Sequence, residues 1–191
     1  MYEFKTEPYQ HQQLAYDNSW QTPAYALFME MGTGKTKVAI DTMGTLFTEG
    51  KINTALIIAP KGVYSNWVNK EIPQHLSDHV KVDLLLWQPN QTQKFKKRLT
   101  EVARGTDNSV LRILVMNTEA LSTKKGTKVA QRFLEVNPEN FVVVDESTSI
   151  KNRNAQRTKN IVKLGKVAKY KRILTGSPIT KTPMDLYAQC E

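Results

Sequence analysis

Short apolar runs alternate with helical patterns along the whole chain, and this alternation limits the folds that the chain can adopt. Strands that alternate with helices form a parallel sheet with helices on both faces, so the expected fold class is α/β. We expect one domain, residues 1–191, with surface loops at 105–109 and 123–128. The expected strands are Tyr25–Met29, Ala55–Ala59, Val82–Leu86, Leu111–Met116, Val142–Asp145 and Arg172–Leu174. The expected helices are 35–48, 64–74, 93–104, 128–135, 155–164 and a last one that opens at Pro183.

A glycine-containing segment joins the first apolar run to the first helical pattern and has the form of a phosphate-binding loop. Its glycines let backbone N–H groups turn toward phosphate oxygens, Lys35 would reach the terminal phosphates, and the Thr36 hydroxyl can ligate Mg²⁺. The full Walker pattern has a glycine six residues before the lysine, where this chain has Met29. The alternative is a glycine-rich turn that caps a helix. The candidate ATP-binding residues of this segment are Met31, Gly32, Thr33, Gly34, Lys35 and Thr36.

Two carboxylates follow the apolar run near residue 142 and complete the pattern of an ATPase. A strand buried on both faces would deliver Asp145 and Glu146 to the C-terminal edge of the sheet, where ligands bind in open parallel α/β folds. Asp145 would hold Mg²⁺ through water, and Glu146 would orient and deprotonate the attacking water. The alternative is an ordinary acidic turn after a core strand. The order of the two motifs favours a catalytic set of Lys35, Asp145 and Glu146.

Composition and charge describe a globular protein with one strongly basic segment. Hydrophobic residues make up 40% and charged residues 24%, no apolar run reaches the length of a membrane span, and the single cysteine is Cys190. We therefore expect no membrane partner and a cytoplasmic location, in a bacterial or virus-infected cell. The net charge is +9, and residues 151–172 carry nine basic and no acidic residues, while the rest has 18 of each. This segment is either a surface that faces a polyanion or a solvated helix face.

Read in order, the motifs resemble the first RecA-like lobe of a superfamily-two helicase of the Swi/Snf-like branch, over nearly the whole chain. Pro8-Tyr9-Gln10-His11-Gln12 is similar to the upstream glutamine motif of that family. The resemblance implies that the amide of Gln12 reads the adenine edge, with Gln10 as the alternative. Either glutamine could instead be an exposed residue at the start of a helix.

Two further segments resemble the parts of the family that contact a nucleic-acid backbone. Residues 56–61, followed by Asn66-Trp67, are similar to motif Ia, which implies a DNA contact by Lys61. Trp67 is expected to pack in the core. Residues 115–121 resemble the next strand and loop, which implies a second contact near Asn117.

The acidic pair and a late turn resemble the family's second and third motifs. Asp-Glu-Ser-Thr at 145–148 departs from many relatives, because Thr148 stands in the place of a histidine that relays the nucleotide state. Residues 174–178 resemble the third motif, in which hydroxyls of Thr175 and Ser177 would couple hydrolysis to movement. The alternative is a turn that precedes a helix.

The resemblance implies an ATP- and Mg²⁺-dependent translocase or helicase that moves along double-stranded DNA. In this family ATP lies between two RecA-like lobes, and the second lobe supplies arginine fingers. No second lobe is present in the chain, which stops after the third motif, so we expect a lobe of a larger protein that is nearly inactive when isolated. The different-class alternative is a one-lobe regulatory module that binds nucleotide or DNA without efficient catalysis. A kinase or another P-loop enzyme would explain neither Asn66-Trp67 nor the turn at 174–178.

Overall fold

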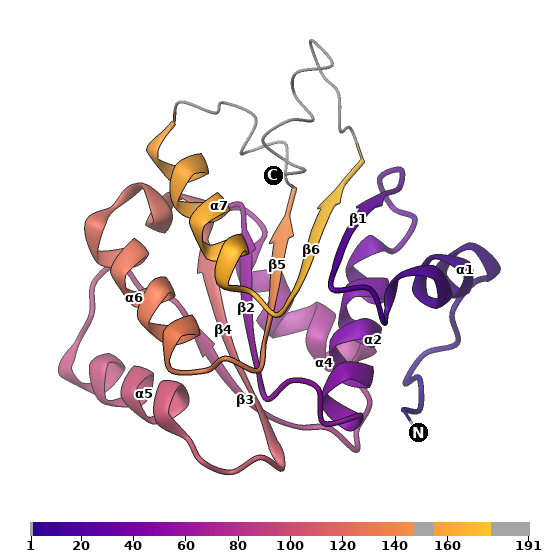
Figure 1. The fold of residues 1–191 in the computed structure, drawn as a ribbon, viewed down its shortest axis with the longest axis horizontal. Coiled ribbons are helices and arrows are strands. Elements are labelled where there is room, and N and C mark those ends of the chain that lie inside the picture. Colours follow the sequence, from indigo (N-terminus) through magenta and orange to yellow (C-terminus); the bar gives the residue numbers. More distant parts are fainter. Residues whose placement is uncertain (1, 147–154, 177–191) are drawn as a thin grey trace.

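The structure, a computed structural model, describes residues 2–146 and 155–176 and contains one fully parallel six-stranded sheet (Figure 1). The strand order is β1-β6-β5-β2-β4-β3. Every expected strand is confirmed, with ends that differ by two residues at most. The strands are β1 (Ala24–Phe28), β2 (Thr54–Ala59), β3 (Lys81–Leu86), β4 (Val110–Asn117), β5 (Asn140–Asp145) and β6 (Tyr170–Thr175).

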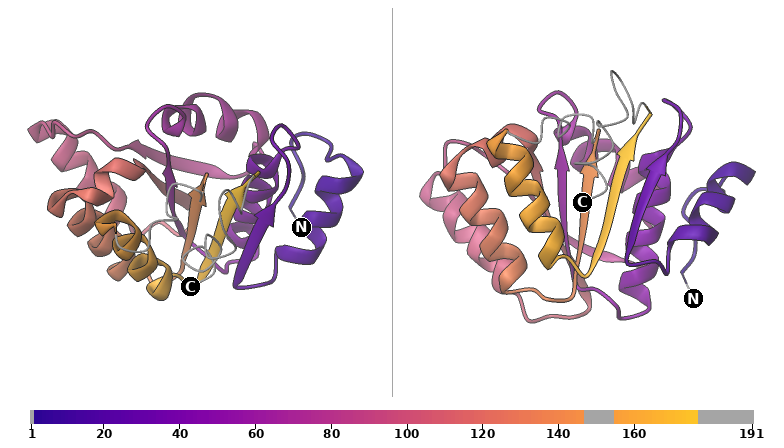
Figure 2. Two further views of the ribbon diagram at one scale, coloured as in Figure 1. Left: turned by 90° about the horizontal axis from the view of Figure 1, so that it is seen from above. Right: turned by 45° about the horizontal axis from the view of Figure 1, so that its top comes forward.

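Helices cover both faces of the sheet (Figures 1 and 2). The α-helices are α1 (Gln10–Ser19), α2 (Lys35–Thr48), α3 (Tyr64–Asn66), α4 (Ile72–His75), α5 (Gln93–Arg104), α6 (Lys124–Glu135) and α7 (Gln156–Val167). A π-helical turn (Trp67–Glu71) joins α3 to α4, and a 3₁₀ turn (Thr118–Ser122) follows β4. Residues of α2 and α4 belong to one apolar core, and residues of α5, α6 and α7 belong to the other.

The central strands are buried on both faces, which explains why they read as continuous apolar runs. Ala55 and Ile57 of β2 pack in the core beneath α2, whereas Leu56 and Ile58 pack in the core beneath α5–α7. All six residues of β2 are buried, as parallel sheets with helices on both faces require. The apolar runs therefore predicted both the strands and the two helical layers.

Helix α1 was not among the expected helices, because its sequence carries a weak apolar signal. Its buried residues are polar ones, Gln12 and Ser19. Contacts outside the helix hold it: the Tyr16 hydroxyl lies 2.7 Å from Thr45 Oγ1 on α2, and Gln12 Oε1 accepts a hydrogen bond from Tyr9 N at 3.0 Å. Tertiary partners rather than periodicity fix this helix.

The expected loop at 123–128 is wrong, because α6 begins at Lys124. Thr123 caps the helix, since its Oγ1 accepts a hydrogen bond from Gly126 N at 3.0 Å. Gly126 suggested a loop, but here the glycine lets α6 pack closely against the preceding 3₁₀ turn. A Cβ at this position would lie 2.2 Å from the Ala120 carbonyl oxygen.

The single helix expected at 64–74 is interrupted by the π-helical turn. Pro73 stands at the beginning of α4 and has no N–H to donate into the preceding turn, which disfavours a continuous α-helix. Single π-turns often occur at functional sites. This turn begins at Trp67, a residue that contacts the acidic pair described below.

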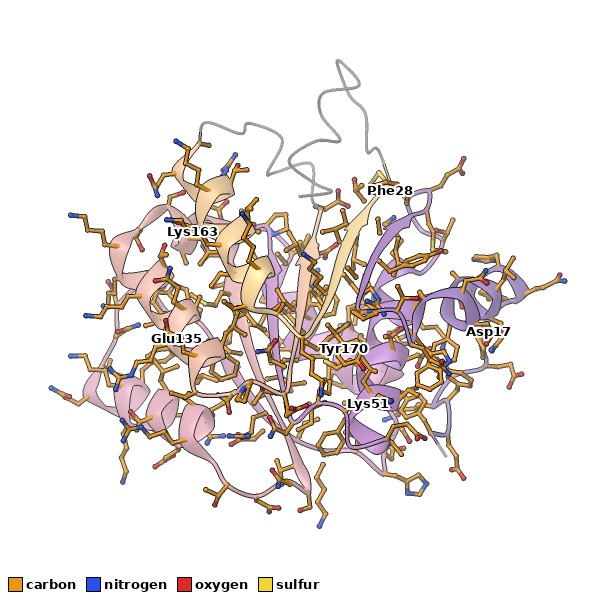
Figure 3. The ribbon with its side chains drawn as sticks, in the orientation of Figure 1. Asp17, Phe28, Lys51, Glu135, Lys163 and Tyr170 are labelled. Carbon is orange, nitrogen blue, oxygen red and sulfur yellow. The ribbon has the colours of Figure 1, made fainter. Side chains whose placement is uncertain are left out.

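Arg172 is buried, so the nine basic residues of 151–172 do not all lie on one surface. Its side chain is 1% exposed, and its Nη2 donates to the Ser19 carbonyl oxygen at 2.5 Å. The residue thus ties the end of α1 to β6. Lys159, Lys163 and Lys166 of α7 are exposed, and Figure 3 shows Lys163 on the outer side of that helix.

Candidate ATP-binding and acidic site

Strand order brings the two candidate motifs together at the C-terminal edge of the sheet, which is the upper edge in Figure 1. Strand β6 lies between β1 and β5, with Phe28 paired to Thr175 and Asp145 paired to Leu174. The loop after β1 and the two carboxylates at the end of β5 line one cleft of about 460 Å³. Sequence positions more than a hundred residues apart therefore share one site.

Backbone geometry agrees with a phosphate-binding loop. Gly32 and Gly34 have φ of 77° and 88°, in the left-handed region that favours glycine. Gly34 precedes the first residue of α2, and Gly34, Lys35 and Thr36 line the cleft, so the start of this helix borders it as an anion site requires. The φ of Met29 is not positive, so the loop does not need a glycine at that position.

Lys35 lies across the loop and is 8% exposed. Its Nζ donates to the carbonyl oxygens of Met29 and Glu30, both at 2.9 Å. An ammonium has three donors, so one remains for a phosphate oxygen in the same cleft. The Thr36 side chain lines this cleft as well.

Gln12 and His11 connect α1 to the loop. Gln12 Nε2 and His11 Nε2 donate to the Thr33 carbonyl oxygen at 3.0 Å and 2.9 Å. A Cβ on Gly34 would lie 2.3 Å from Gln12 Nε2, so the glycine admits this contact. The Gln12 amide therefore supports the loop, while Gln10 is exposed, and the reading of adenine by Gln12 stays a prediction.

Asp145 is held by two donors at the end of β5. Trp67 Nε1 donates to Asp145 Oδ2 and Glu146 N donates to Asp145 Oδ1, both at 2.9 Å. Burial raises the pKa of Asp145 above its usual value, and the two hydrogen bonds and Lys35 oppose this shift. A nearby cation would favour the charged carboxylate further.

Glu146 is the one non-glycine residue with positive φ among the described residues, at 48°. Such a backbone conformation is disfavoured for residues with a Cβ and is found at functional sites, where the surroundings impose it. It turns the chain sharply after β5, and the Glu146 side chain lines the cleft beside Lys35 and Asp145.

The remaining predicted residues occupy the same edge of the sheet. Lys61 follows β2 and is exposed, and Asn117 ends β4, the strand that pairs with β2 through Ala59. Thr175 is buried, and its carbonyl oxygen accepts a hydrogen bond from Met29 N at 3.3 Å. Thr148 and Ser177 lie outside the described residues.

The sequence profile of the SNF2-related domain family matches residues 9–189. The chain belongs to this family. The match confirms the resemblance to Swi/Snf-like superfamily-two proteins that the motifs indicate. None of the helices in residues 2–146 and 155–176 has the length and apolar character needed to span a membrane.

Known relatives of this SNF2-related domain are much longer proteins. The Xenopus tropicalis SWI/SNF-related matrix-associated actin-dependent regulator of chromatin, subfamily A containing DEAD/H box 1, is 27% identical over 157 residues, which cover 82% of this chain and 14% of the relative. The human helicase-like transcription factor is 28% identical over 173 residues, which cover 86% of this chain and 16% of that protein. An uncharacterized ATP-dependent helicase of Mycoplasma genitalium is 30% identical over 160 residues, which cover 83% of this chain and 14% of that protein.

Solved structures share the RecA-like fold of the SNF2-related domain. The Sulfolobus solfataricus SWI2/SNF2 ATPase core in complex with dsDNA superposes with a TM-score of 0.71 at 20% identity, over 98% of this chain and 36% of that one. The UvsW helicase from bacteriophage T4 superposes with a TM-score of 0.65 at 14% identity, over 96% of this chain and 57% of that one. At these identities the likeness shows the fold alone.

Sequence reasoning missed one polar role in the SNF2-related domain. Trp67 packs in the core as expected, with 2% of its surface exposed, but its indole N–H also bonds the carboxylate of Asp145. A buried tryptophan usually finds an acceptor for this N–H, which is the one signal in the sequence that could have indicated the contact.

Proposed function

We propose that this SNF2-related domain is the first ATPase lobe of an ATP-dependent DNA translocase or helicase, which hydrolyses ATP with Mg²⁺ and moves along double-stranded DNA. The observation that supports it most is the single cleft lined by Lys35, Asp145 and Glu146. Two residue types that ATP hydrolysis needs, a phosphate-facing cation and a carboxylate base, thus face one space.

The residues present fit a nucleotide and a hard divalent cation. The left-handed glycines shape a loop for phosphate oxygens, and the Thr36 hydroxyl and Asp145 carboxylate are the oxygen donors that Mg²⁺ prefers. Among the described residues no group of three or more His, Cys, Asp or Glu could hold a metal ion, and a cation shared with phosphates does not require such a group. When bound, Mg²⁺ would neutralise charge on the phosphates.

Each residue of the cleft would then have a distinct role. Lys35 would donate its remaining N–H to a terminal phosphate oxygen while its other donors hold the loop. Glu146 would orient a water molecule and accept its proton. Trp67 would keep Asp145 in one orientation, which is a positioning role.

The proposal includes partners outside the chain. Lys61 and Asn117, which follow or end adjacent strands, would contact one DNA backbone with little sequence preference. A second RecA-like lobe of the same protein would supply arginine fingers, and Thr175 with Ser177 would couple hydrolysis to movement. The proposed location is the cytoplasm of a bacterial or virus-infected cell, as the composition predicts.

Two substitutions separate the binding and catalytic roles. Lys35→Ala removes the phosphate-facing cation, so we expect ATP binding by the chain to weaken about tenfold or more, measured by calorimetry. Glu146→Gln keeps the shape of the side chain, so binding should persist, while hydrolysis by the protein with both lobes falls about 10²- to 10⁴-fold. Equal loss of binding in the two variants would contradict the role of Glu146 as base.

A further inference from the structure

A hollow of about 360 Å³ lies between α5 and α6. These two helices cover the face of the sheet opposite α2 (Figure 1). Its lining includes Leu99, Ala103, Val129 and Phe133, together with Val136, whose side chain is 46% exposed. Apolar surface of this kind that remains open to solvent is typical of a contact surface. We refer to this hollow as the α5–α6 groove.

Cations surround the α5–α6 groove. Lys96, Arg104 and Arg132 line it together with the apolar residues. Among the described residues none of these three cations forms an ion pair, whereas Arg98 on the same helix binds Asp83 and Glu101. The groove therefore combines an apolar floor with cations that form no ion pair among the described residues, which complements an acidic amphipathic ligand.

A second hollow of about 470 Å³, at the N-terminal end of β4, contains a buried arginine. Arg112 is 5% exposed, and its Nε has no hydrogen-bond partner. The charge of the adjacent Asp83 offsets the effect of burial on Arg112 only in part, and both oxygens of that carboxylate are already bonded by Arg98. Glu139 also lines this hollow, but it is paired with Lys169.

A buried guanidinium that lacks a hydrogen-bonded carboxylate is costly, because the hydration it loses is not fully replaced. Burial lowers the pKa of Arg112, which reflects the same cost. A carboxylate that entered the hollow could bond the guanidinium of Arg112 and add a second counter-charge. The two hollows adjoin, since Ala103, Arg104 and Val136 line both.

We propose that the α5–α6 groove and the Arg112 hollow together bind an acidic amphipathic peptide segment of a partner protein. Apolar side chains of the segment occupy the groove, and one of its carboxylates bonds Arg112. A duplex backbone is too stiff and wide to bring a phosphate to a side chain that is 95% buried, whereas a glutamate can reach it. The site lies at the N-terminal edge of the sheet, opposite the ATP cleft, so both can be filled at once.

Fluorescence anisotropy with the 191-residue chain tests the site. The probe is a labelled 14-residue peptide with leucines at helical spacing and glutamates between them, and the matched probe carries glutamine in place of every glutamate. We expect the glutamate peptide to bind more tightly. Arg112→Met should weaken its binding about tenfold or more, since a charged hydrogen bond is lost. The melting temperature of that variant should stay level or rise, because an unpaired buried charge is removed.

Two further variants make the test decisive. Arg104→Gln alters an exposed cation that lines both hollows and should also weaken peptide binding, so the proposal stays testable if Arg112→Met does not fold. Lys163→Gln removes an exposed cation from α7, outside the groove, and should leave binding unchanged. Equal affinity for the two peptides would overturn the proposal. So would an equal loss in all three variants, or displacement of the peptide by inorganic phosphate or duplex DNA as readily as by unlabelled peptide.

Discussion

Replacing Trp67 with phenylalanine removes one hydrogen bond from the proposed Mg²⁺ ligand and little else. The indole N–H is a donor only, and it bonds Asp145 Oδ2 at 2.9 Å. Phenylalanine keeps most of the buried ring but cannot donate. Asp145 then retains the Glu146 amide as its donor on the other oxygen and is free to rotate about it.

The size of the effect follows from the charge and burial of the pair. A hydrogen bond to a charged group contributes about 1.5–3 kcal/mol, which corresponds to roughly 10- to 150-fold in an equilibrium constant. Loss of a residue that orients a metal ligand typically costs about 10- to 100-fold in metal affinity or activity. We therefore expect Mg²⁺-dependent ATP binding to weaken about tenfold or more.

Calorimetry of ATP binding with Mg²⁺ and with EDTA isolates this effect. The matched control is Trp87→Phe, because Trp87 is 3% exposed and packs edge-to-face on Phe95 in the other core. Both variants should lose about 1–3 kcal/mol of unfolding free energy from the smaller ring. Only Trp67→Phe should weaken binding with Mg²⁺, and neither should change binding with EDTA.

Two outcomes would refute the reasoning. If Trp67→Phe and Trp87→Phe bind Mg²⁺-ATP with equal affinity, Trp67 does not position Asp145 for the cation. If Trp67→Phe weakens ATP binding equally with EDTA, the loss reflects a change of the whole cleft.

Three other predictions concern DNA, the isolated lobe and pH. Lys61→Ala should weaken binding to duplex DNA of any sequence and reduce the salt dependence of that binding by roughly one phosphate contact. Replacing Lys163 and Lys166 with glutamine should weaken DNA binding less, and titrations at several salt concentrations measure both effects. The isolated chain should hydrolyse ATP about 10³- to 10⁵-fold more slowly than the protein with both lobes, and equal rates would contradict the two-lobe mechanism. Burial, followed by Lys37 and Lys70, lowers the pKa of His75 from 6.5, so the unfolded chain binds the proton more tightly. The free energy of unfolding should thus fall as the pH drops through and below about 6.5, and His75→Gln should flatten this dependence in thermal melts from pH 5 to 7.

The order of the elements and the edge of the sheet that carries the candidate site could be predicted because their signals are local. A strand buried on both faces must be apolar throughout, so runs such as that of β2 identify themselves. A phosphate loop needs glycines at fixed spacing before a helix, and Gly32 and Gly34 have the left-handed backbone that the pattern implies. In a parallel sheet the C-terminal ends of all strands lie at one edge, so the two motifs were expected to meet there.

Local patterns also failed in particular places. Helix α1 carries a polar sequence, and contacts with α2 and the phosphate loop hold it. The glycine at 126 suggested a loop, but it permits close packing inside a capped helix. In both cases the deciding partner lies on another element, where periodicity carries no information.

By itself the sequence determined an α/β sheet with a candidate phosphate loop and an acidic pair, because each of these depends on neighbours in the chain. The tertiary structure alone decided the polar partners of buried side chains. Trp67 donates a hydrogen bond to Asp145, which lies 78 positions away in the sequence, and Arg172 donates to the Ser19 carbonyl oxygen, 153 positions away. The Nε of Arg112 has no hydrogen-bond partner. A hydrogen bond or an unpaired charge depends on which atoms the fold brings within about 3 Å, and one-dimensional patterns do not encode that proximity.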